Sequence, residues 1–291
     1  MQLTTSDLLA RGTARLAPLL ERPSLDAGLL LAFSLGVPRV RLKSHPEEPR
    51  SEPDLQHYLA LIERRAQGEP LAYITGMREF WTLELRVNRE VLVPRPETEL
   101  LVETALAALD GIARPRVLDL GTGTGAIAVA IASVRPDAQV WAVDRSGEAL
   151  AVAARNAARL LDAARPGGPV QLVRSDWYGA LERALRFDVI VSNPPYIASG
   201  DPHLTEGDLR FEPRGALTDE ADGLSAIRAI IAGAPTRFDE QRGGVLWLEH
   251  GYDQAAAVRM LLAQAGFAAV RSECDLAGIE RISGGEWQAG V

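Results

Sequence analysis

The sequence predicts an α/β protein with a doubly wound, mostly parallel sheet that carries helices on both faces. Three observations support this fold class. After residue 114, short apolar runs alternate with alanine-rich segments of helical spacing, which is the pattern of repeated strand–helix–strand units. Residues 1–76 show helical spacing only, which predicts a small all-helical domain. Between these regions, apolar residues recur at every second position, which is typical of strands.

The N-terminal domain, residues 1–76, is expected to contain three amphipathic helices. Thr5 or Ser6 can cap the first, because hydroxyl oxygens accept the unpaired N–H groups at a helix start. Ser24 can cap the second helix, which ends at Gly36, and the third helix ends near Gly68. The apolar residues that define the first and third stripes are Leu8, Leu9, Leu16, Leu19, Leu20, Leu55, Tyr58, Leu59 and Ile62.

A β-hairpin linker is expected over residues 77–93. Alternating apolar residues from Trp81 to Val87 predict its first strand, Asn88–Arg89 its turn and Val91–Val93 its second strand. Residues 94–291 then form the α/β domain. Its six expected strands are Arg116–Leu120, Gln139–Val143, Val170–Arg174, Asp188–Ser192, Gly244–Glu249 and Ala268–Cys274, and its clearest helices are Ala126–Ser133 and Glu148–Leu161.

The composition is that of an ordinary globular protein. Of 291 residues, 47% are hydrophobic and 24% are charged, which is enough apolar material for a full core without a metal or disulfide. The formal net charge of −8 opposes broad electrostatic attraction to nucleic acid. We therefore expect no direct nucleic-acid partner.

Cysteine and histidine usage predicts no metal site. Cys274 is the only cysteine, so no internal disulfide can form, and we expect it to be a small core residue. The four histidines are scattered without metal-ligand spacing. The N-terminus lacks a signal-peptide pattern, and apolar runs near it are too short to span a bilayer. A cytoplasmic location and no membrane partner are expected.

A glycine-rich turn joins the first strand of the α/β domain to a helix. The turn comprises Gly121, Thr122, Gly123, Thr124 and Gly125. Glycines allow sharp turns and close approach of the backbone to a ligand, and the N–H groups of the helix start favour an anionic group. The spacing is GxGxG and differs from the GxGxxG of dinucleotide-binding folds. The alternative is a tight turn without a ligand.

Acidic and aromatic residues follow the next two strands. Asp144 lies about 20 residues past the glycines, where a carboxylate can accept both hydroxyl hydrogens of a ribose. The alternative is a helix cap. Asp176 can accept from an exocyclic amine and Trp177 can stack on a purine, or they are an ordinary loop acid and a partly buried indole.

The tetrapeptide Asn193-Pro194-Pro195-Tyr196 follows the fourth strand. Its prolines have no N–H, so the backbone offers mainly carbonyl acceptors. The Asn193 carbonyl, the Pro194 carbonyl and the Tyr196 ring can together receive a planar –NH2 group. The alternative is a rigid turn after a strand.

The carboxyl ends of parallel strands face one crevice, where open α/β sheets bind ligands. A ribose binder, a purine stacker and an –NH2 receptor are therefore expected to converge. No strong base, nucleophile or metal joins them. This suits methyl transfer from a sulfonium donor, which needs mainly positioning, with neutral acceptors stabilising the positive charge that develops on the nitrogen.

Taken together, these motifs resemble those of the release-factor glutamine N5-methyltransferases, a family within the class I S-adenosylmethionine-dependent methyltransferases. The resemblance covers nearly the whole chain. The tetrapeptide is shared with adenine-N6 methyltransferases, whereas Pro94–Glu97 and Phe211–Pro213 are more specific. The matching segments are Arg78–Trp81, Leu92–Glu99, Gly121–Ala128, Ser175–Trp177, Val191–Ile197, Arg210–Pro213 and Leu248–Gly251.

The resemblance implies a class I methyltransferase fold, S-adenosyl-L-methionine as cofactor and S-adenosyl-L-homocysteine as product. It implies that the substrate is the glutamine of the Gly-Gly-Gln motif of class I peptide chain release factors, so that the enzyme modulates translation termination. It also implies substrate recognition by the helical domain. The implied cofactor contacts are Gly121, Thr122, Gly123, Thr124, Gly125, Asp144, Trp177 and Asn193. The implied catalytic residues are Asn193, Pro194 and Tyr196, and the implied substrate contacts are these three and Pro195.

Two other functions remain open at this point. The tetrapeptide also suggests an adenine-N6 nucleic-acid methyltransferase, although the chain shows neither a basic surface nor a nucleic-acid-binding module. A non-enzymatic nucleotide-binding or scaffold protein would transfer no methyl group at all.

Overall fold

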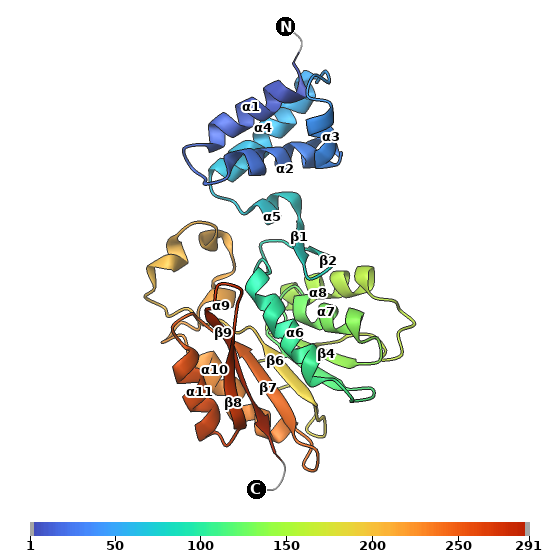
Figure 1. The fold of residues 1–291 in the computed structure, drawn as a ribbon, viewed down its shortest axis with the longest axis vertical. Helices are drawn as coiled ribbons and strands as arrows, with labels where there is room; N and C mark the ends of the chain where they lie inside the picture. Colours follow the sequence, from blue (N-terminus) through green and yellow to red (C-terminus); the bar gives the residue numbers. More distant parts are fainter. Residues whose placement is uncertain (1–2, 289–291) are drawn as a thin grey trace. The chain divides into compact units, whose positions relative to one another are not determined.

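The computed structural model describes residues 3–288, and the chain divides into two compact units, Met1–Met77 and Arg78–Val291 (Figure 1). The N-terminal unit is helical, as predicted. Its helices enclose a core that includes Leu8, Leu31 and Tyr58, and the Tyr58 hydroxyl donates to the Ala27 carbonyl at 3.1 Å. The helices are α1 (Thr5–Leu16), α2 (Pro23–Leu35), α3 (Arg39–Ser44), α4 (Glu52–Ala66) and α5 (Leu71–Thr75).

Two helix starts in this unit differ from the predicted ones. Thr4 caps α1 instead of Thr5 or Ser6, and its hydroxyl accepts from the Asp7 N–H while the Asp7 carboxylate accepts from the Thr4 N–H. Pro23 occupies the first position of α2, where its missing N–H is not needed, so the predicted cap at Ser24 is wrong. The predicted end at Gly36 is confirmed, because this glycine is left-handed with φ 63°.

Within residues 78–288, seven strands form one sheet in the order β5-β4-β3-β6-β7-β9-β8. Strands β3 to β7 are parallel, and β9 is antiparallel to both β7 and β8. The predicted mostly parallel, doubly wound sheet is confirmed. The strands are β3 (Arg116–Leu120), β4 (Gln139–Asp144), β5 (Gln171–Arg174), β6 (Val189–Ser192), β7 (Gly244–Glu249), β8 (Ala268–Cys274) and β9 (Glu280–Trp287).

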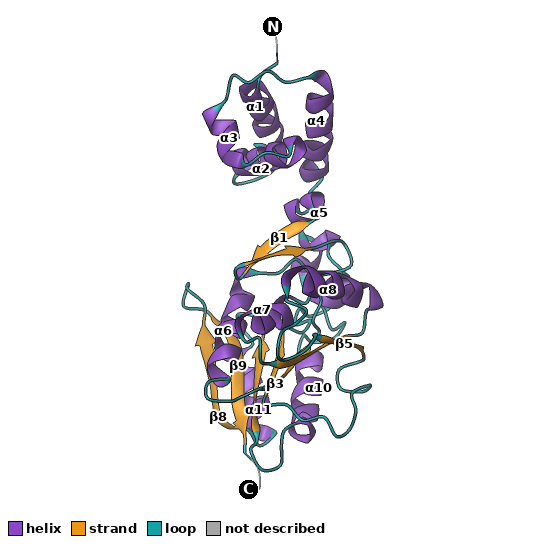
Figure 2. Ribbon diagram, turned by 90° about the vertical axis from the view of Figure 1, so that its right-hand side faces the viewer, coloured by secondary structure: helices purple, strands orange, loops and turns teal. Residues whose placement is uncertain are grey.

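Helices cover both faces of this sheet (Figures 1 and 2). Side chains alternate along each strand, so Val117 packs with α6 and α7, while Leu118 and Leu120 pack with α10 and α11 on the other face. The helices of this unit are α6 (Glu99–Ala108), α7 (Ala126–Val134), α8 (Gly147–Leu160), α9 (Arg214–Leu217), α10 (Ser225–Gly233) and α11 (Ala255–Gln264), and the 3-10 turns are η1 (Pro96–Thr98), η2 (Pro202–Thr205), η3 (Leu209–Phe211) and η4 (Ala234–Arg237).

The strand order creates a switch point in the middle of the sheet. The chain runs outward from β3 through β4 to β5, then crosses back and runs outward the other way through β6 and β7. The carboxyl ends of β3 and β6 lie side by side, with Leu120 paired to Ser192. Open α/β sheets bind their ligands at such a point. Gly121 and Asn193 directly follow these two strands.

Strand β9 was not predicted from the sequence. It contains Gly284 and Gly285, which weaken the sequence signal of a strand. The structure explains Gly284, because a β-carbon there would lie 2.3 Å from the Trp247 ring and 2.4 Å from the Leu246 carbonyl. The strand therefore needs glycine for close packing. The expected core position of Cys274 is also wrong, since this residue is exposed at the end of β8.

The strand pair before the sheet also differs from the predicted one. Strands β1 (Met77–Phe80) and β2 (Leu83–Arg86) form a two-stranded sheet, and the residues between them are Trp81 and Thr82. The predicted strand at Val91–Val93 is therefore wrong. A turn does occur at Asn88, whose carbonyl accepts from the Val91 N–H at 3.3 Å, but it does not join two strands. Trp81 has φ 58°, and its N–H donates to the Glu99 carboxylate at 2.7 Å. A side-chain contact with α6 thus supports a turn that lacks a glycine.

Candidate functional site

A cavity of about 270 Å³ lies at the switch point of the sheet. The segments that follow β3, β4, β5 and β6 line it, together with residues 90–98 and 213–216. The predicted site residues that line it are Gly121, Thr122, Gly123, Thr124, Asp144, Trp177, Asn193 and Pro195. The structure therefore brings the three separate motifs of the sequence to one place.

The glycine turn has the backbone shape that the sequence suggested. Gly121, Gly123 and Gly125 all have positive φ, at 74°, 54° and 79°. The N–H groups of Gly121 and Thr122 both donate to the Val143 carbonyl, which ties the turn to β4. Gly125 precedes α7, and a β-carbon on it would lie 3.1 Å from that of Ala153 in α8. A larger residue at Gly125 would crowd the contact between α7 and α8, and the positive φ also favours glycine there.

Asp144 is held by two backbone N–H groups. Its Oδ2 atom accepts from Gly123 at 2.9 Å, and its Oδ1 atom accepts from Ser146 at 2.9 Å. The cap of α8 is Ser146, whose hydroxyl accepts from the Ala149 N–H. Asp144 is therefore not the cap of α8. Each of its oxygens keeps a second lone pair for another donor.

Trp177 lies beside the glycine turn in a strained backbone conformation. Its φ is 45°, which is uncommon for a bulky residue and is concentrated at functional sites. The indole packs close to Gly121, since a β-carbon on that glycine would lie 3.6 Å from the ring. Asp176, the preceding residue, is exposed and also lines the cavity.

The side-chain amide of Asn193 has a defined orientation. Its Nδ2 atom donates to the hydroxyl of Thr98 at 3.1 Å. Because the amide nitrogen is engaged by Thr98, the carbonyl oxygen Oδ1 is the end of the amide available to a ligand. Thr98 is buried and belongs to η1, directly before α6. Sequence reasoning assigned no role to this threonine.

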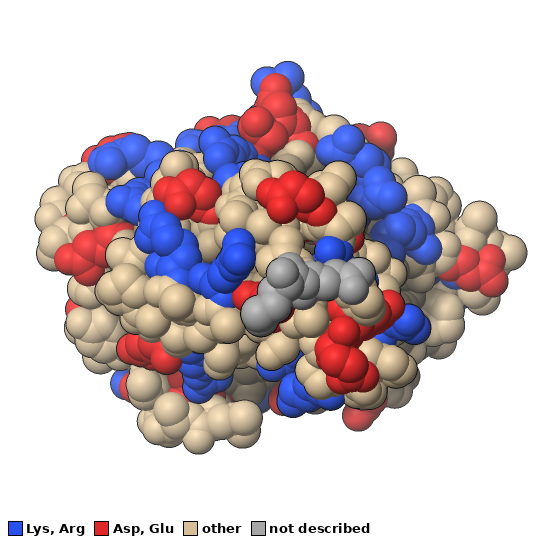
Figure 3. Space-filling view, turned by 90° about the horizontal axis from the view of Figure 1, so that it is seen from above, with Lys and Arg blue, Asp and Glu red and all other residues tan. Residues whose placement is uncertain are grey.

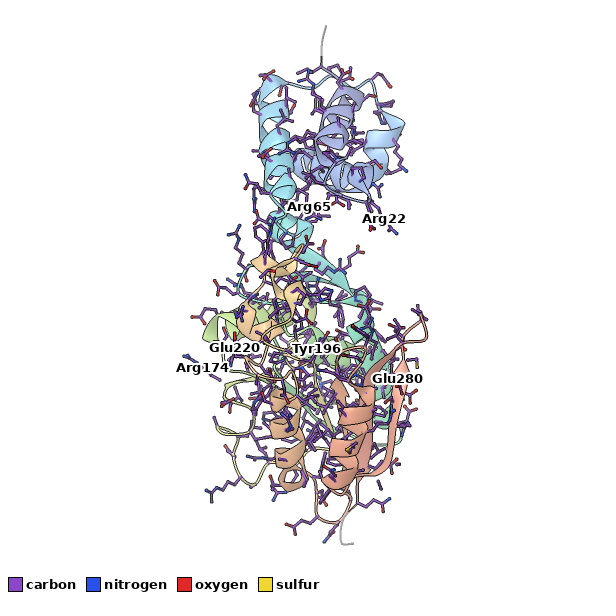
Figure 4. The ribbon with its side chains drawn as sticks, turned by 90° about the vertical axis from the view of Figure 1, so that its left-hand side faces the viewer. Arg22, Arg65, Arg174, Tyr196, Glu220 and Glu280 are labelled. Carbon is purple, nitrogen blue, oxygen red and sulfur yellow. The ribbon has the colours of Figure 1, made fainter. Side chains whose placement is uncertain are left out.

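Tyr196 and Glu249 form a second polar group behind the tetrapeptide. The Tyr196 hydroxyl donates to Glu249 Oε1 at 3.4 Å. Figure 4 shows Tyr196 among the side chains inside its unit, while Arg174 and Glu220 lie at the surface. Glu249 is almost fully buried at the end of β7, and burial raises the pKa of its carboxyl to about 7. Burial also raises the pKa of the Tyr196 hydroxyl.

Three predicted residues do not line the cavity. Within residues 3–288, the residues that line the cavity do not include Gly125, Pro194 or Tyr196. Pro194 is buried and lies between Asn193 and Pro195, which both line the cavity. The roles expected for these three residues stay predictions.

An ion pair joins two segments at the rim of the cavity. Arg95 Nη2 lies 2.5 Å from Glu212 Oε1, and the Val93 N–H donates to Glu212 Oε2 at 3.2 Å. The Glu212 side chain is fully buried, and burial raises the pKa of its carboxyl while Arg95 opposes the rise. This contact links two sequence motifs that lie 117 residues apart. It holds residues 212–216 against the cavity.

We expect Glu212→Gln to loosen the rim segment. Loss of the charged hydrogen bonds should cost about 1.5–3 kcal/mol, which corresponds to about 10- to 100-fold more frequent local opening. Amide hydrogen exchange of residues 209–216 measures this opening. Glu206→Gln is the matched control, because Glu206 is exposed on the same loop. Equal exchange in both variants would contradict the role of the ion pair.

Two further buried polar residues support the glycine turn. Asp119 Oδ2 accepts from the Thr122 hydroxyl at 2.6 Å and from the Ala128 N–H at 3.3 Å. Asn156 donates to the Thr124 carbonyl at 2.9 Å and joins it to the backbone of Arg86. Sequence reasoning missed both roles. Each role did have a signal in the sequence: Asp119 is an acid inside an apolar strand, and Asn156 is an amide on the apolar face of a helix.

Residues 3–288 contain no cluster of three or more His, Cys, Asp or Glu side chains that could hold a metal ion. None of the helices in this part of the chain is long and apolar enough to cross a bilayer.

Two family models match the chain. Residues 7–76 match the PrmC N-terminal domain, and residues 96–207 match the methyltransferase small domain. The unit Arg78–Val291 therefore contains a methyltransferase domain.

Curated relatives match almost the full length. The release factor glutamine methyltransferase of Burkholderia pseudomallei (strain K96243) is 65% identical over 262 residues, which are 90% of this chain and 91% of the relative. The release factor glutamine methyltransferase of Bordetella pertussis (strain Tohama I) is 54% identical over 90% of this chain and 94% of the relative.

A solved structure shares the fold. The T. thermophilus 16S rRNA N2 G1207 methyltransferase in complex with AdoMet and guanosine has a TM-score of 0.51 and 23% identity. The match covers 73% of this chain and 50% of that chain. At this identity the likeness concerns the fold alone.

Proposed function

This chain belongs to the family of release factor glutamine methyltransferases, and from that premise we propose a specific reaction for it. It transfers a methyl group from S-adenosyl-L-methionine to the side-chain amide nitrogen (N5) of a glutamine. The acceptor is the glutamine of the Gly-Gly-Gln motif in class I peptide chain release factors. The product of the cofactor is S-adenosyl-L-homocysteine, and the site of action is the cytoplasm, where translation terminates.

The orientation of Asn193 is the observation that carries this proposal. Thr98 accepts a hydrogen bond from the amide nitrogen of Asn193, so the carbonyl oxygen is left as the acceptor at the cavity. A glutamine –NH2 group needs two acceptors for its two hydrogens. We assign these acceptors to Asn193 Oδ1 and the carbonyl of Pro194. We also assign the Tyr196 ring to the wall around the –NH2 group, although it lies outside the residues that line the cavity of about 270 Å³.

We assign the cavity to a nucleoside cofactor with an amino-acid tail. We assign the ribose hydroxyls to Asp144, whose oxygens are held in place by Gly123 and Ser146. Trp177 packs against the purine, and the backbone from Gly121 to Gly125 faces the amino-acid tail. The start of α7 favours its carboxylate.

The residues of the chain act by positioning. The cofactor supplies a methyl group on a positively charged sulfur. Asn193 Oδ1 and the Pro194 carbonyl hold the amide so that its nitrogen lone pair points at that methyl carbon. As the new nitrogen–carbon bond forms, the same two oxygens stabilise the positive charge on the nitrogen. The electron pair of the broken sulfur–methyl bond stays on the sulfur, and the nitrogen then releases one of its two protons to solvent.

We assign recognition of the protein substrate to the helical residues 1–76, with residues 77–93 as the linker and 94–291 as the methyltransferase domain. Nucleic acid is the alternative acceptor, because the tetrapeptide also suits adenine-N6 chemistry. The net charge of −8 argues against it. On the face shown in Figure 3, Lys and Arg side chains are interspersed with Asp and Glu.

Mass spectrometry of a class I release factor incubated with this protein and S-adenosyl-L-methionine tests the proposal. A gain of one methyl group on the motif glutamine is the expected result. A release factor with that glutamine replaced by alanine is the control and should gain none. Methyl transfer to DNA or RNA instead of the release factor would favour the adenine-N6 alternative, and no transfer to any acceptor would favour a non-enzymatic protein.

A further inference from the structure

Thr98 lies between Asn193 and Glu249. Its hydroxyl oxygen accepts from Asn193 Nδ2 at 3.1 Å. The same hydroxyl approaches Glu249, where it acts with the Tyr196 hydroxyl to oppose the rise in the pKa of that carboxyl. Tyr196 therefore contacts this buried carboxyl group directly, and Asn193 contacts the threonine beside it.

Within the part of the chain that the structure describes, only one of the two carboxyl oxygens of Glu249 has a hydrogen-bond partner. Tyr196 donates to Oε1 at 3.4 Å, whereas Oε2 is buried and has no well-formed hydrogen bond to any described residue. Glu249 is 2% exposed, so water does not solvate it freely. A buried carboxyl with an unfilled acceptor is costly unless another role retains it.

The charged groups around Glu249 do not neutralise it. Glu97 of η1 raises the pKa of its carboxyl, and Arg281 of β9 lowers it. Arg281 is already paired with Asp275, at 2.9 Å between Nε and Oδ2. When Glu249 ionises, its negative charge therefore lies directly behind the tetrapeptide.

The direction of the hydrogen bonds follows from the available protons. Thr98 has one hydroxyl hydrogen, and its oxygen already accepts from Asn193. The hydrogen can point to an ionised Glu249. The Thr98 oxygen can accept two hydrogen bonds, so Asn193 can donate to it in either protonation state of Glu249. Only the ionised carboxylate draws the Thr98 hydrogen toward itself, which makes the Thr98 oxygen a stronger acceptor for the Asn193 amide.

We propose that Glu249 is a positioning residue that orients the Asn193 carbonyl through Thr98 and places a negative charge behind the methyl acceptor. This inference rests on the proposed function, because it concerns the same –NH2 site. The carboxylate polarises the chain from Thr98 to Asn193, so that Asn193 Oδ1 becomes a stronger acceptor. It also opposes the positive charge that forms on the substrate nitrogen.

A pH profile follows from the ionisation of Glu249. The pKa of its carboxyl is raised to about 7, so kcat should rise as pH increases through that value. The Glu249→Gln variant should have a lower kcat, by about tenfold at pH 8, and should lose this component of the profile. Burial also raises the pKa of Asp119 to about 7, and Asp119 is still present in the variant, so only the part of the profile that disappears in Glu249→Gln is assigned to Glu249.

The free energy of unfolding should change with pH in the opposite direction to kcat. The folded-state pKa of Glu249 lies above its ordinary value, so protonation favours the folded state. This contribution is complete at acidic pH and is lost as pH rises through about 7. Glu249→Gln should therefore be at least as stable as the wild type at pH 8. A lower kcat together with an unchanged or higher Tm separates positioning from unfolding.

Thr98 provides the second test, with a matched pair of variants. Thr98→Val removes the hydroxyl and should lower kcat by about 10- to 100-fold, whereas Thr98→Ser retains it and should recover most of the rate. The double variant Thr98→Val with Glu249→Gln should lose less than the two single losses combined, because part of the Glu249 effect passes through Thr98 to Asn193. Glu240→Gln, at an exposed site, is the control for the glutamate change.

Methyl transfer by the wild type to the release factor is measured in the same assay. A failure of the positioning role of Glu249 can therefore be distinguished from a failure of the proposed function. If the wild type transfers methyl groups but Glu249→Gln and Thr98→Val retain normal kcat and pH profile, the positioning role is wrong. If the losses of the two variants add, they act independently and the route through Thr98 is wrong. If the wild type methylates no release factor, the proposed function itself fails.

Discussion

Replacing Asn193 with alanine is expected to lower kcat by about 10²- to 10³-fold. The change removes one of two oxygens assigned to the substrate –NH2 group. By analogy with the loss of one oxyanion-hole donor, this costs about 2–4 kcal/mol of transition-state stabilisation. The structure gives a second reason, because only an amide can both donate to Thr98 and present a carbonyl to the cavity.

The measurement is single-turnover methyl transfer to a release factor at saturating cofactor. Affinity for the cofactor is measured in parallel, and Tm shows that the variant is folded. Asn193→Asp is the informative companion, because it keeps an acceptor oxygen but cannot donate to Thr98 as the amide does. Near-normal turnover in Asn193→Ala would contradict the role of this side chain.

The second large effect is expected for Asp144→Ala, which changes another residue that lines the cavity. Two hydrogen bonds from ribose hydroxyls to a carboxylate are assigned to this residue, and each charged bond contributes about 1.5–3 kcal/mol. Affinity for S-adenosyl-L-methionine should fall by at least about 10- to 100-fold. At saturating cofactor, kcat should change little, because these contacts are equal in the ground and transition states.

Calorimetric titration with the cofactor and its product measures this loss. Asp144→Asn is the graded control, since it retains one carbonyl oxygen and nearly the same volume. Asp176→Asn tests a neighbouring acid that lines the same cavity but is exposed. A drop in kcat with unchanged cofactor affinity would exclude the ribose assignment for Asp144.

Much of the fold was predictable because local sequence and topology agree. The strand around Leu118 is apolar and ends in glycines, and the strand around Ile190 is apolar and ends in prolines. Once the strands are parallel, their carboxyl ends must share one edge. That argument correctly placed Gly121, Asp144, Trp177 and Asn193 around one cavity.

The missed elements depend on tertiary contacts. Strand β9 is held by pairing with β7 and β8, and Gly284 is required by the Trp247 ring, which belongs to another strand. The hairpin turn at Trp81 is supported by Glu99, which is 18 residues away. Neither contact has a signal in the local pattern.

The polar groups behind the site were missed for the same reason. Thr98 and Asn193 are 95 residues apart, and their hydrogen bond exists only in the folded chain. Glu249 did carry a sequence signal, since an acid directly follows the apolar residues Trp247 and Leu248 at the end of a strand. Its partners could not be deduced from that signal.

A structure of this protein with S-adenosyl-L-homocysteine and a release factor tests the central claim most directly. We predict that the glutamine amide nitrogen lies within about 2.7–3.2 Å of both Asn193 Oδ1 and the Pro194 carbonyl oxygen. The sulfur of the product should lie on the line of the nitrogen lone pair. An amide held by other groups, with Asn193 Oδ1 turned away from it, would contradict the account.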